Sequence, residues 1–97
     1  MNERRVVITG LGWVTSLGLS VDQVWDRLCQ GHSGIGQITR FDTSAHGTTI
    51  GGEIAAWDSP NIPKRDAKRL DRFAQFAVNA SIDAVNDAGL DFANEDL

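Results

Sequence analysis

The chain has 97 residues, of which 41% are hydrophobic and 23% are charged, with ten glycines and two prolines. This composition is typical of a folded globular protein and excludes a collagen-like, coiled-coil or disordered chain. The net charge of −4 argues against nucleic acid as the main partner, and no run approaches the ~20 apolar residues that would cross a membrane.

The first predicted element is a strand at residues 6–9. Val6-Val7-Ile8-Thr9 is a continuous β-branched run, typical of a strand buried on both faces, usually in a parallel sheet. Gly10 and Gly12 follow and predict a turn. They do not complete the G-x-G-x-x-G pattern of a dinucleotide site, because Thr15 replaces the third glycine and the bulky Trp13 stands in the loop. We therefore predict no cofactor.

An amphipathic helix is predicted to begin after Ser20. Ser20 and Gln23 match the S-x-x-Q capping box, which pairs an N-cap side chain with the helix's third residue. Gly31 is placed to end the helix in a left-handed conformation. One face of this helix is apolar and is expected to pack into a core; its members are Val21, Val24, Trp25, Leu28 and Cys29.

The middle of the chain is predicted to be mostly loop. Residues 31–47 are rich in Gly, Ser, Thr and Asp, which favours an ordered loop. Residues 48–56 favour a short second strand, in which Gly51 and Gly52 indicate a bulge or an edge position. Residues 58–63 predict a turn.

The longest predicted helix runs from about Asp66 to Ala88, with Gly89 and Leu90 as a Schellman ending. Apolar residues cover most of its circumference, so it expects partners on several sides. Its polar residues form one narrow stripe, made of Arg72, Gln75, Asn79, Asp83 and Asn86.

These elements do not complete a core. A strand buried on both faces needs neighbouring strands, and a helix that is apolar nearly all round needs a sheet or other helices beside it. The predicted fold class is therefore α/β and incomplete as a core: a buried strand, a helix, a short second strand and a long buried helix.

Cysteine and histidine do not form a metal or catalytic site by pattern. Cys29 and His32 have C-x-x-H spacing and His46 follows, but zinc needs about four ligands. Cys29 also lies on the apolar helix face, so we expect a buried, unreactive thiol. A lone cysteine cannot form an internal disulfide, and no secretory signal is visible, so a cytoplasmic location is expected.

The chain contains one basic island, at residues 64–72. It holds five basic and two acidic side chains, whereas the rest of the chain is acidic. Cations at a helix start are disfavoured by the helix dipole, so their concentration favours a docking surface for an acidic partner. A solvated helix end is the alternative interpretation of the same pattern.

Several short motifs stand in order and at fixed spacing over essentially the whole chain. They are residues 4–12, Ser16-Leu17-Gly18, Trp25, Leu28, Gly31, Ser33-Gly34-Ile35, Phe41-Asp42-Thr43-Ser44, Asp71-Arg72-Phe73, Ala84 and Asp87-Ala88-Gly89-Leu90. Together they resemble the start of the elongating β-ketoacyl-[acyl-carrier-protein] synthases, which belong to the thiolase-like superfamily.

The resemblance implies the N-terminal part of a thiolase-like fold, truncated and without a second domain in residues 1–97. It implies an acyltransferase of fatty-acid biosynthesis that works as a homodimer without a cofactor. The enzyme extends acyl chains by decarboxylative Claisen condensation with malonyl-carrier protein. Its chemistry uses a cysteine and two histidines that lie downstream, so none of Cys29, His32 and His46 matches a catalytic residue, and the segment alone is expected to be inactive.

One functional feature of the family does map onto this chain. The family's basic cluster before the long helix contacts the acidic helix of the acyl carrier protein, and by position Arg65, Lys68 and Arg69 match it, with Lys64 adjacent. Two alternatives stay open: a polyketide-type ketosynthase or chain-length factor, and a non-catalytic module that binds an acidic partner through residues 64–72.

Overall fold

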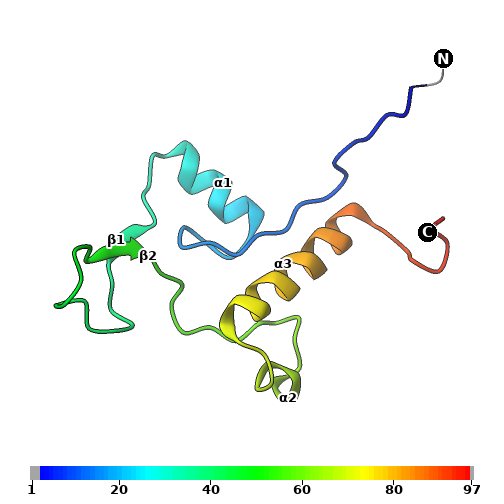
Figure 1. The fold of residues 1–97 in the computed structure, drawn as a ribbon. Helices are drawn as coiled ribbons and strands as arrows, with labels where there is room; N and C mark the ends of the chain where they lie inside the picture. Colours follow the sequence, from blue (N-terminus) through cyan, green and yellow to red (C-terminus); the bar gives the residue numbers. More distant parts are fainter. Residues whose placement is uncertain (1–2, 97) are drawn as a thin grey trace.

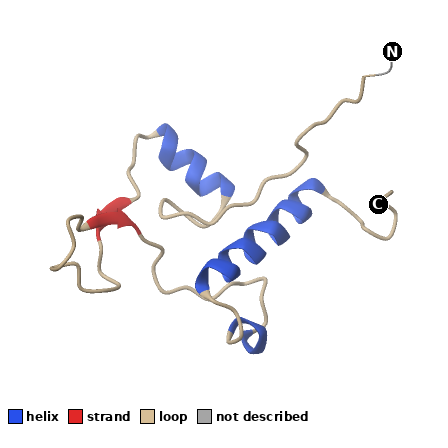
Figure 2. Cartoon of the chain, in the orientation of Figure 1, coloured by secondary structure: helices blue, strands red, loops and turns tan. Residues whose placement is uncertain are grey.

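The structure is a computed structural model that describes residues 3–96. Its elements, in chain order, are helix α1 (Val21–Cys29), strands β1 (Ile35–Gln37) and β2 (Ile50–Gly52), and helices α2 (Lys64–Ala67) and α3 (Arg72–Ala88). Figure 2 shows separate helices and one small sheet joined by loops, which agrees with the α/β class and with an incomplete core.

Helix α1 forms where its local signals place it. The Ser20 hydroxyl accepts a hydrogen bond from the Gln23 backbone N–H at 3.2 Å, and the Gln23 side chain accepts one from the Leu19 N–H at 3.1 Å. Gly31 follows the helix with a φ of +76°, as predicted. In the predicted capping box the Gln23 side chain would accept from the Ser20 backbone N–H. It accepts instead from the N–H of Leu19, one residue earlier.

The predicted strand at Val6–Thr9 does not form. This segment is extended away from the rest of the chain (Figure 1), and Val6 is 92% exposed. A strand needs a neighbour that supplies hydrogen bonds, and no strand within residues 3–96 pairs with it.

The middle of the chain forms a sheet of two strands, whereas the sequence predicted a single strand there. β1 and β2 pair antiparallel, with Ile35 opposite Gly52 and Gln37 opposite Ile50. β2 falls inside the predicted segment 48–56, but β1 falls inside the predicted loop 31–47, so that loop prediction was wrong in part. Ile35 and Ile50 are both exposed, and the sheet buries no core.

The predicted long helix is divided. The chain forms the four-residue helix α2, turns through residues 68–71, and begins α3 at Arg72 after Asp71 adopts an extended conformation with ψ 159°. The ending is as predicted: Gly89 is left-handed with φ +67°, and the Leu90 N–H donates to the Val85 carbonyl at 3.3 Å.

Very little of the described chain is buried. Val24 and Ile62 are the only buried apolar side chains among residues 3–96, while Phe73 on α3 is 75% exposed. The radius of gyration is 17.3 Å, whereas a compact domain of this length has about 13 Å. The expectation of a long buried helix is therefore wrong for this chain, because no element within residues 3–96 covers the apolar side of α3 that carries Phe73.

The turn predicted at Gly10 and Gly12 does not form there; the chain turns later, between Thr15 and Gly18, and the two glycines instead allow close packing. A Cβ on Gly12 would lie 2.0 Å from the Ala80 carbonyl oxygen, and one on Gly10 would lie 2.4 Å from that of Ala84. The intervening Leu11 N–H donates to the Asp87 carboxylate at 3.0 Å. Residues 10–12 thus lie directly against α3, where only glycine leaves room for the helix backbone.

Candidate functional site

Four exposed cations gather on α2 and the turn that follows it. We call Lys64, Arg65, Lys68 and Arg69 the basic cluster; all four side chains are exposed. The one ion pair among residues 3–96 joins Arg65 to Asp66, with Nε and Oδ1 3.8 Å apart and both groups well exposed. At that distance in water the pair is weak, so the cluster stays strongly positive.

The basic cluster is not carried by one continuous helix. Lys64 and Arg65 are in α2, whereas Lys68 is its C-cap and Arg69 lies in the turn beyond it. The turn is tight: the Arg69 N–H donates to the Asp66 carbonyl at 3.0 Å and the Leu70 N–H to that of Ala67 at 3.2 Å. The four cations nevertheless remain on one short, compact segment.

Arg72, the fifth cation of the island, turns inward instead. Its guanidinium donates to the backbone carbonyls of Ile54 at 2.7 Å and Ala55 at 3.3 Å. It also lies over the ring of Phe76, with Cζ 5.1 Å from the centroid, close enough for a cation–π contact. Arg72 therefore ties α3 to the segment after β2 and is not part of the exposed cluster.

A buried polar network lies under the segment that leads into α2. Asn79 of α3 is 2% exposed. Its side-chain oxygen accepts hydrogen bonds from the Ser59 hydroxyl at 2.6 Å and from the Asn61 amide at 2.9 Å. The Asn61 amide also donates to Asp83 at 2.8 Å. The middle of the polar stripe of α3 thus faces the protein at Asn79, while Phe73 and Val78 of the same helix are exposed.

The sequence predicted this polar stripe but not the residues that hydrogen-bond to it. The signal that could have identified the partner was the pair of small polar residues Ser59 and Asn61 in the predicted turn, shortly before α2. Polar side chains on an otherwise apolar helix are expected to be hydrogen-bonded when buried. Gln75 belongs to the same stripe and contacts the turn that carries the basic cluster.

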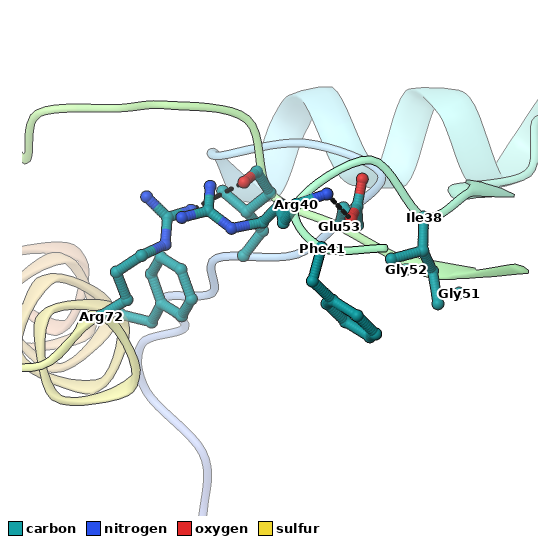
Figure 3. A pocket seen from close by; sticks show the side chains of 9 residues that line it. Ile38, Arg40, Phe41, Gly51, Gly52, Glu53 and Arg72 are labelled. Carbon is teal, nitrogen blue, oxygen red and sulfur yellow. Dashed lines mark hydrogen bonds between the residues drawn. The ribbon is translucent and has the colours of Figure 1, made fainter. Parts of the chain in front are cut away.

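A groove of about 360 Å³ runs between α3 and the sheet. Figure 3 shows Arg72 reaching from α3 toward the segment of Glu53, with Gly51 and Gly52 at the other end. The Glu53 carboxylate accepts from the backbone N–H groups of Arg40 at 3.0 Å and Thr39 at 2.9 Å. The Arg40 N–H holds the pKa of Glu53 below its ordinary value. No cysteine, serine or histidine lines the groove, so we assign no chemistry to it.

The cysteine and the histidines are not part of the basic cluster. Cys29 is exposed, which contradicts the predicted buried thiol. The reason is that its neighbours Trp25 and Leu28 are also uncovered, so only Val24 of the apolar face of α1 is buried. His46 packs edge-on against Phe41, with the two ring centroids 5.7 Å apart. No group of three potential metal ligands occurs among residues 3–96.

No helix within residues 3–96 is both long enough and apolar enough to span a bilayer.

Comparison with known proteins identifies what the chain resembles. Residues 3–96 match the family described as "Beta-ketoacyl synthase, N-terminal domain". The 3-oxoacyl-[acyl-carrier-protein] synthase 2 of Synechocystis sp. is 45% identical over 91 residues, covering 93% of this chain and 22% of that protein. The enzyme of the same name from Vibrio cholerae is 38% identical over 96 residues, covering 98% of this chain and 23% of that protein.

A solved structure shares the fold. "The ishigamide ketosynthase/chain length factor" superposes with a TM-score of 0.77 at 36% identity, covering 96% of this chain and 23% of that chain. The chain thus spans less than a quarter of the length of the relatives it matches.

Proposed function

The chain belongs to the β-ketoacyl synthase family, and we propose that it is part of a 3-oxoacyl-[acyl-carrier-protein] synthase that extends acyl chains in fatty-acid biosynthesis. The reaction is a decarboxylative Claisen condensation with malonyl-carrier protein. The family match over residues 3–96 carries the proposal, and relatives named 3-oxoacyl-[acyl-carrier-protein] synthase 2 support the fatty-acid pathway.

A second candidate is a polyketide-type ketosynthase or chain-length factor. The superposition on the ishigamide ketosynthase/chain length factor favours it, at 36% identity. A condensation assay separates the two. The protein that contains this chain is expected to form a 3-oxoacyl product from a saturated acyl-carrier protein and malonyl-carrier protein; a protein that acts only on polyketide intermediates would contradict the fatty-acid assignment.

Within that enzyme we assign residues 1–97 to the first part of the N-terminal domain, with no separate second domain. We place the nucleophilic cysteine and the two histidines outside this chain, so Cys29, His32 and His46 take no part in the chemistry. Assembly as a homodimer and a cytoplasmic location belong to the same proposal and rest on the resemblance to the family.

The part of this chain in the reaction is to dock the acyl carrier protein through Lys64, Arg65, Lys68 and Arg69. Three observations support it: the four cations are exposed, they lie on one short segment, and Arg72 is withdrawn from them by its bonds to Ile54 and Ala55. An exposed basic patch attracts an acidic partner mainly through the association rate and orientation.

Charge reversal tests this docking role. In the protein that contains this chain, Lys68→Glu with Arg69→Glu is expected to raise the KM for acyl-carrier protein while leaving turnover of a small acyl thioester unchanged. The matched control is Arg4→Glu with Arg5→Glu, two neighbouring exposed arginines outside the cluster. Equal loss with both substrates, or equal effects of the two double variants, would overturn the docking assignment.

A further inference from the structure

The basic cluster is held in place by helix α3, and one side chain of α3 contacts it most directly. The Gln75 side-chain amide donates to the Ala67 carbonyl at 3.1 Å and to the Leu70 carbonyl at 3.0 Å. Those two carbonyls flank Lys68 and Arg69 in the sequence. A single half-buried amide therefore spans the turn that carries half of the cluster.

The bond to Leu70 replaces one that the break between α2 and α3 removes, and the bond to Ala67 adds to the one that this carbonyl accepts from the Leu70 N–H at 3.2 Å. In a continuous helix the carbonyls of Ala67 and Leu70 would accept from the N–H groups of Asp71 and Ala74, four residues on. Asp71 is extended, with φ −64° and ψ 159°, so the helical path is interrupted there. Gln75 supplies a donor to both carbonyls from the first turn of α3.

The other end of α2 is attached to the same face of α3. Ser59 and Asn61 donate to the buried side chain of Asn79, one helical turn beyond Gln75. The chain then turns at Pro63, whose carbonyl accepts from the N–H groups of Asp66 and Ala67. A helix of four residues has no stability of its own, so its conformation depends on such attachments.

We infer that Gln75 is a positioning residue for carrier-protein docking: it fixes Lys68 and Arg69 in a defined arrangement before the partner arrives. This inference rests on the docking role proposed above. A cation cluster on a fixed turn loses less conformational freedom on binding than one on a mobile segment, so the attachment improves affinity without contacting the partner.

The test replaces Gln75 with methionine, which has a similar length but no amide donor. In the protein that contains this chain, Gln75→Met is expected to raise the KM for acyl-carrier protein roughly twofold to tenfold, the factor that corresponds to the net contribution of one hydrogen bond. Turnover of a small acyl thioester should not change. Asn86→Met is the control, because Asn86 lies on the same stripe, is exposed, and its side chain makes no hydrogen bond to residues 3–96.

Combining the variants separates positioning from a general structural role. If Gln75 acts through the cations, Gln75→Met should have no further effect on KM once Lys68 and Arg69 are both glutamate. Additive effects, equal loss with both substrates, or no effect of Gln75→Met would overturn the inference while leaving the docking role intact. A null result for the charge reversal alone would instead refute the docking role.

A second measurement does not depend on activity. Hydrogen exchange at the amides of residues 68–70 is expected to quicken in Gln75→Met and to stay unchanged in Asn86→Met. Gln75→Ala is the second variant, for use if the methionine variant does not fold. Unchanged exchange in a folded Gln75 variant would show that another contact fixes the turn, and would also overturn the inference.

Discussion

Removal of the Asn79 side chain is the sharpest perturbation of the polar network, because Asn79 is nearly inaccessible, at 2% exposure. In Asn79→Ala, the Ser59 hydroxyl and the Asn61 amide each lose their acceptor, at present 2.6 and 2.9 Å away. Asp83 also loses the longer bond of 3.3 Å from the Asn79 amide. The segment that leads into α2 is thereby released from α3.

The magnitude follows from these bonds. A neutral hydrogen bond contributes about 0.5–1.5 kcal/mol net, and a buried polar group left without a partner costs about 1–3 kcal/mol. The buried Ser59 hydroxyl would have no acceptor for its proton, although its oxygen still accepts from the Asn61 N–H at 3.1 Å. Asn61 is half-buried and keeps its side-chain bond to Asp83. We therefore expect Asn79→Ala to destabilise α3 and its attached segment by about 2–4 kcal/mol.

Native-state hydrogen exchange is the suitable assay, because it reports the free energy of local opening along α3. In the protein that contains this chain, Asn79→Ala should speed exchange in the middle of α3 roughly 30-fold to 700-fold. The control is Asn86→Ala, the same substitution at an exposed position of the same helix. Similar exchange in the two variants would refute the claim that the inward polar stripe holds α3 to the segment before α2.

Four further predictions follow from particular contacts. Gly12→Ala should detach residues 10–12 from α3, because its Cβ would lie 2.0 Å from the Ala80 carbonyl; loss of the protection of the Leu11 amide would report it, and a protected amide would contradict it. The pKa of Glu53 is lowered by the Arg40 N–H, so its ionised form stabilises the turn at Thr39 and Arg40 at pH values above the ordinary 4.5. That contribution is lost as the pH falls through the lowered folded-state pKa. The chemical shifts of the Thr39 and Arg40 amides should therefore move in acid. Shifts that do not move, or that move equally in Glu53→Gln, would contradict this role of Glu53. Cys29 in the isolated chain should react with iodoacetamide like a free thiol, since it is exposed, and slow labelling would show that something covers it. The isolated chain should form no 3-oxoacyl product from acyl- and malonyl-carrier protein, and measurable product would place catalytic residues inside it.

Local signals were sufficient to predict α1 and the ending of α3. The cap of α1 lies within five residues, Leu19 to Gln23, and Gly89 needs only its own left-handed conformation. Both depend on contacts between close neighbours in the sequence, so the pattern of residues alone predicts them.

Elements that depend on distant residues were predicted less well. The Val6–Thr9 run has the composition of a buried strand but no pairing partner within residues 3–96. β1 lies in a glycine-rich segment and forms through its pairing with β2, whose central pair, Gly36 and Gly51, is fifteen positions apart in the sequence. The break at residues 68–71 is stabilised by Gln75, whose side chain contacts carbonyls behind it in the sequence.

The candidate site was predictable in its residues but not in its geometry. The basic residues were visible as an island in an acidic chain, and the resemblance to the ketoacyl synthases gave that island a partner. In the structure the island divides into four exposed cations and Arg72, which turns inward. Arg72 turns inward because it donates to the Ile54 and Ala55 carbonyls, and the spacing of residues in the sequence does not show that these carbonyls lie beside it.

The salt dependence of the condensation reaction tests the central claim most directly, namely that this chain supplies the carrier-protein docking surface of a ketoacyl synthase. For the protein that contains this chain, the KM for acyl-carrier protein should rise with ionic strength, because salt screens exposed charges. The KM for a small acyl thioester should not change. The Lys68→Glu, Arg69→Glu variant should show a flat or reversed salt dependence, and a slope equal to that of the unmodified protein would contradict the account.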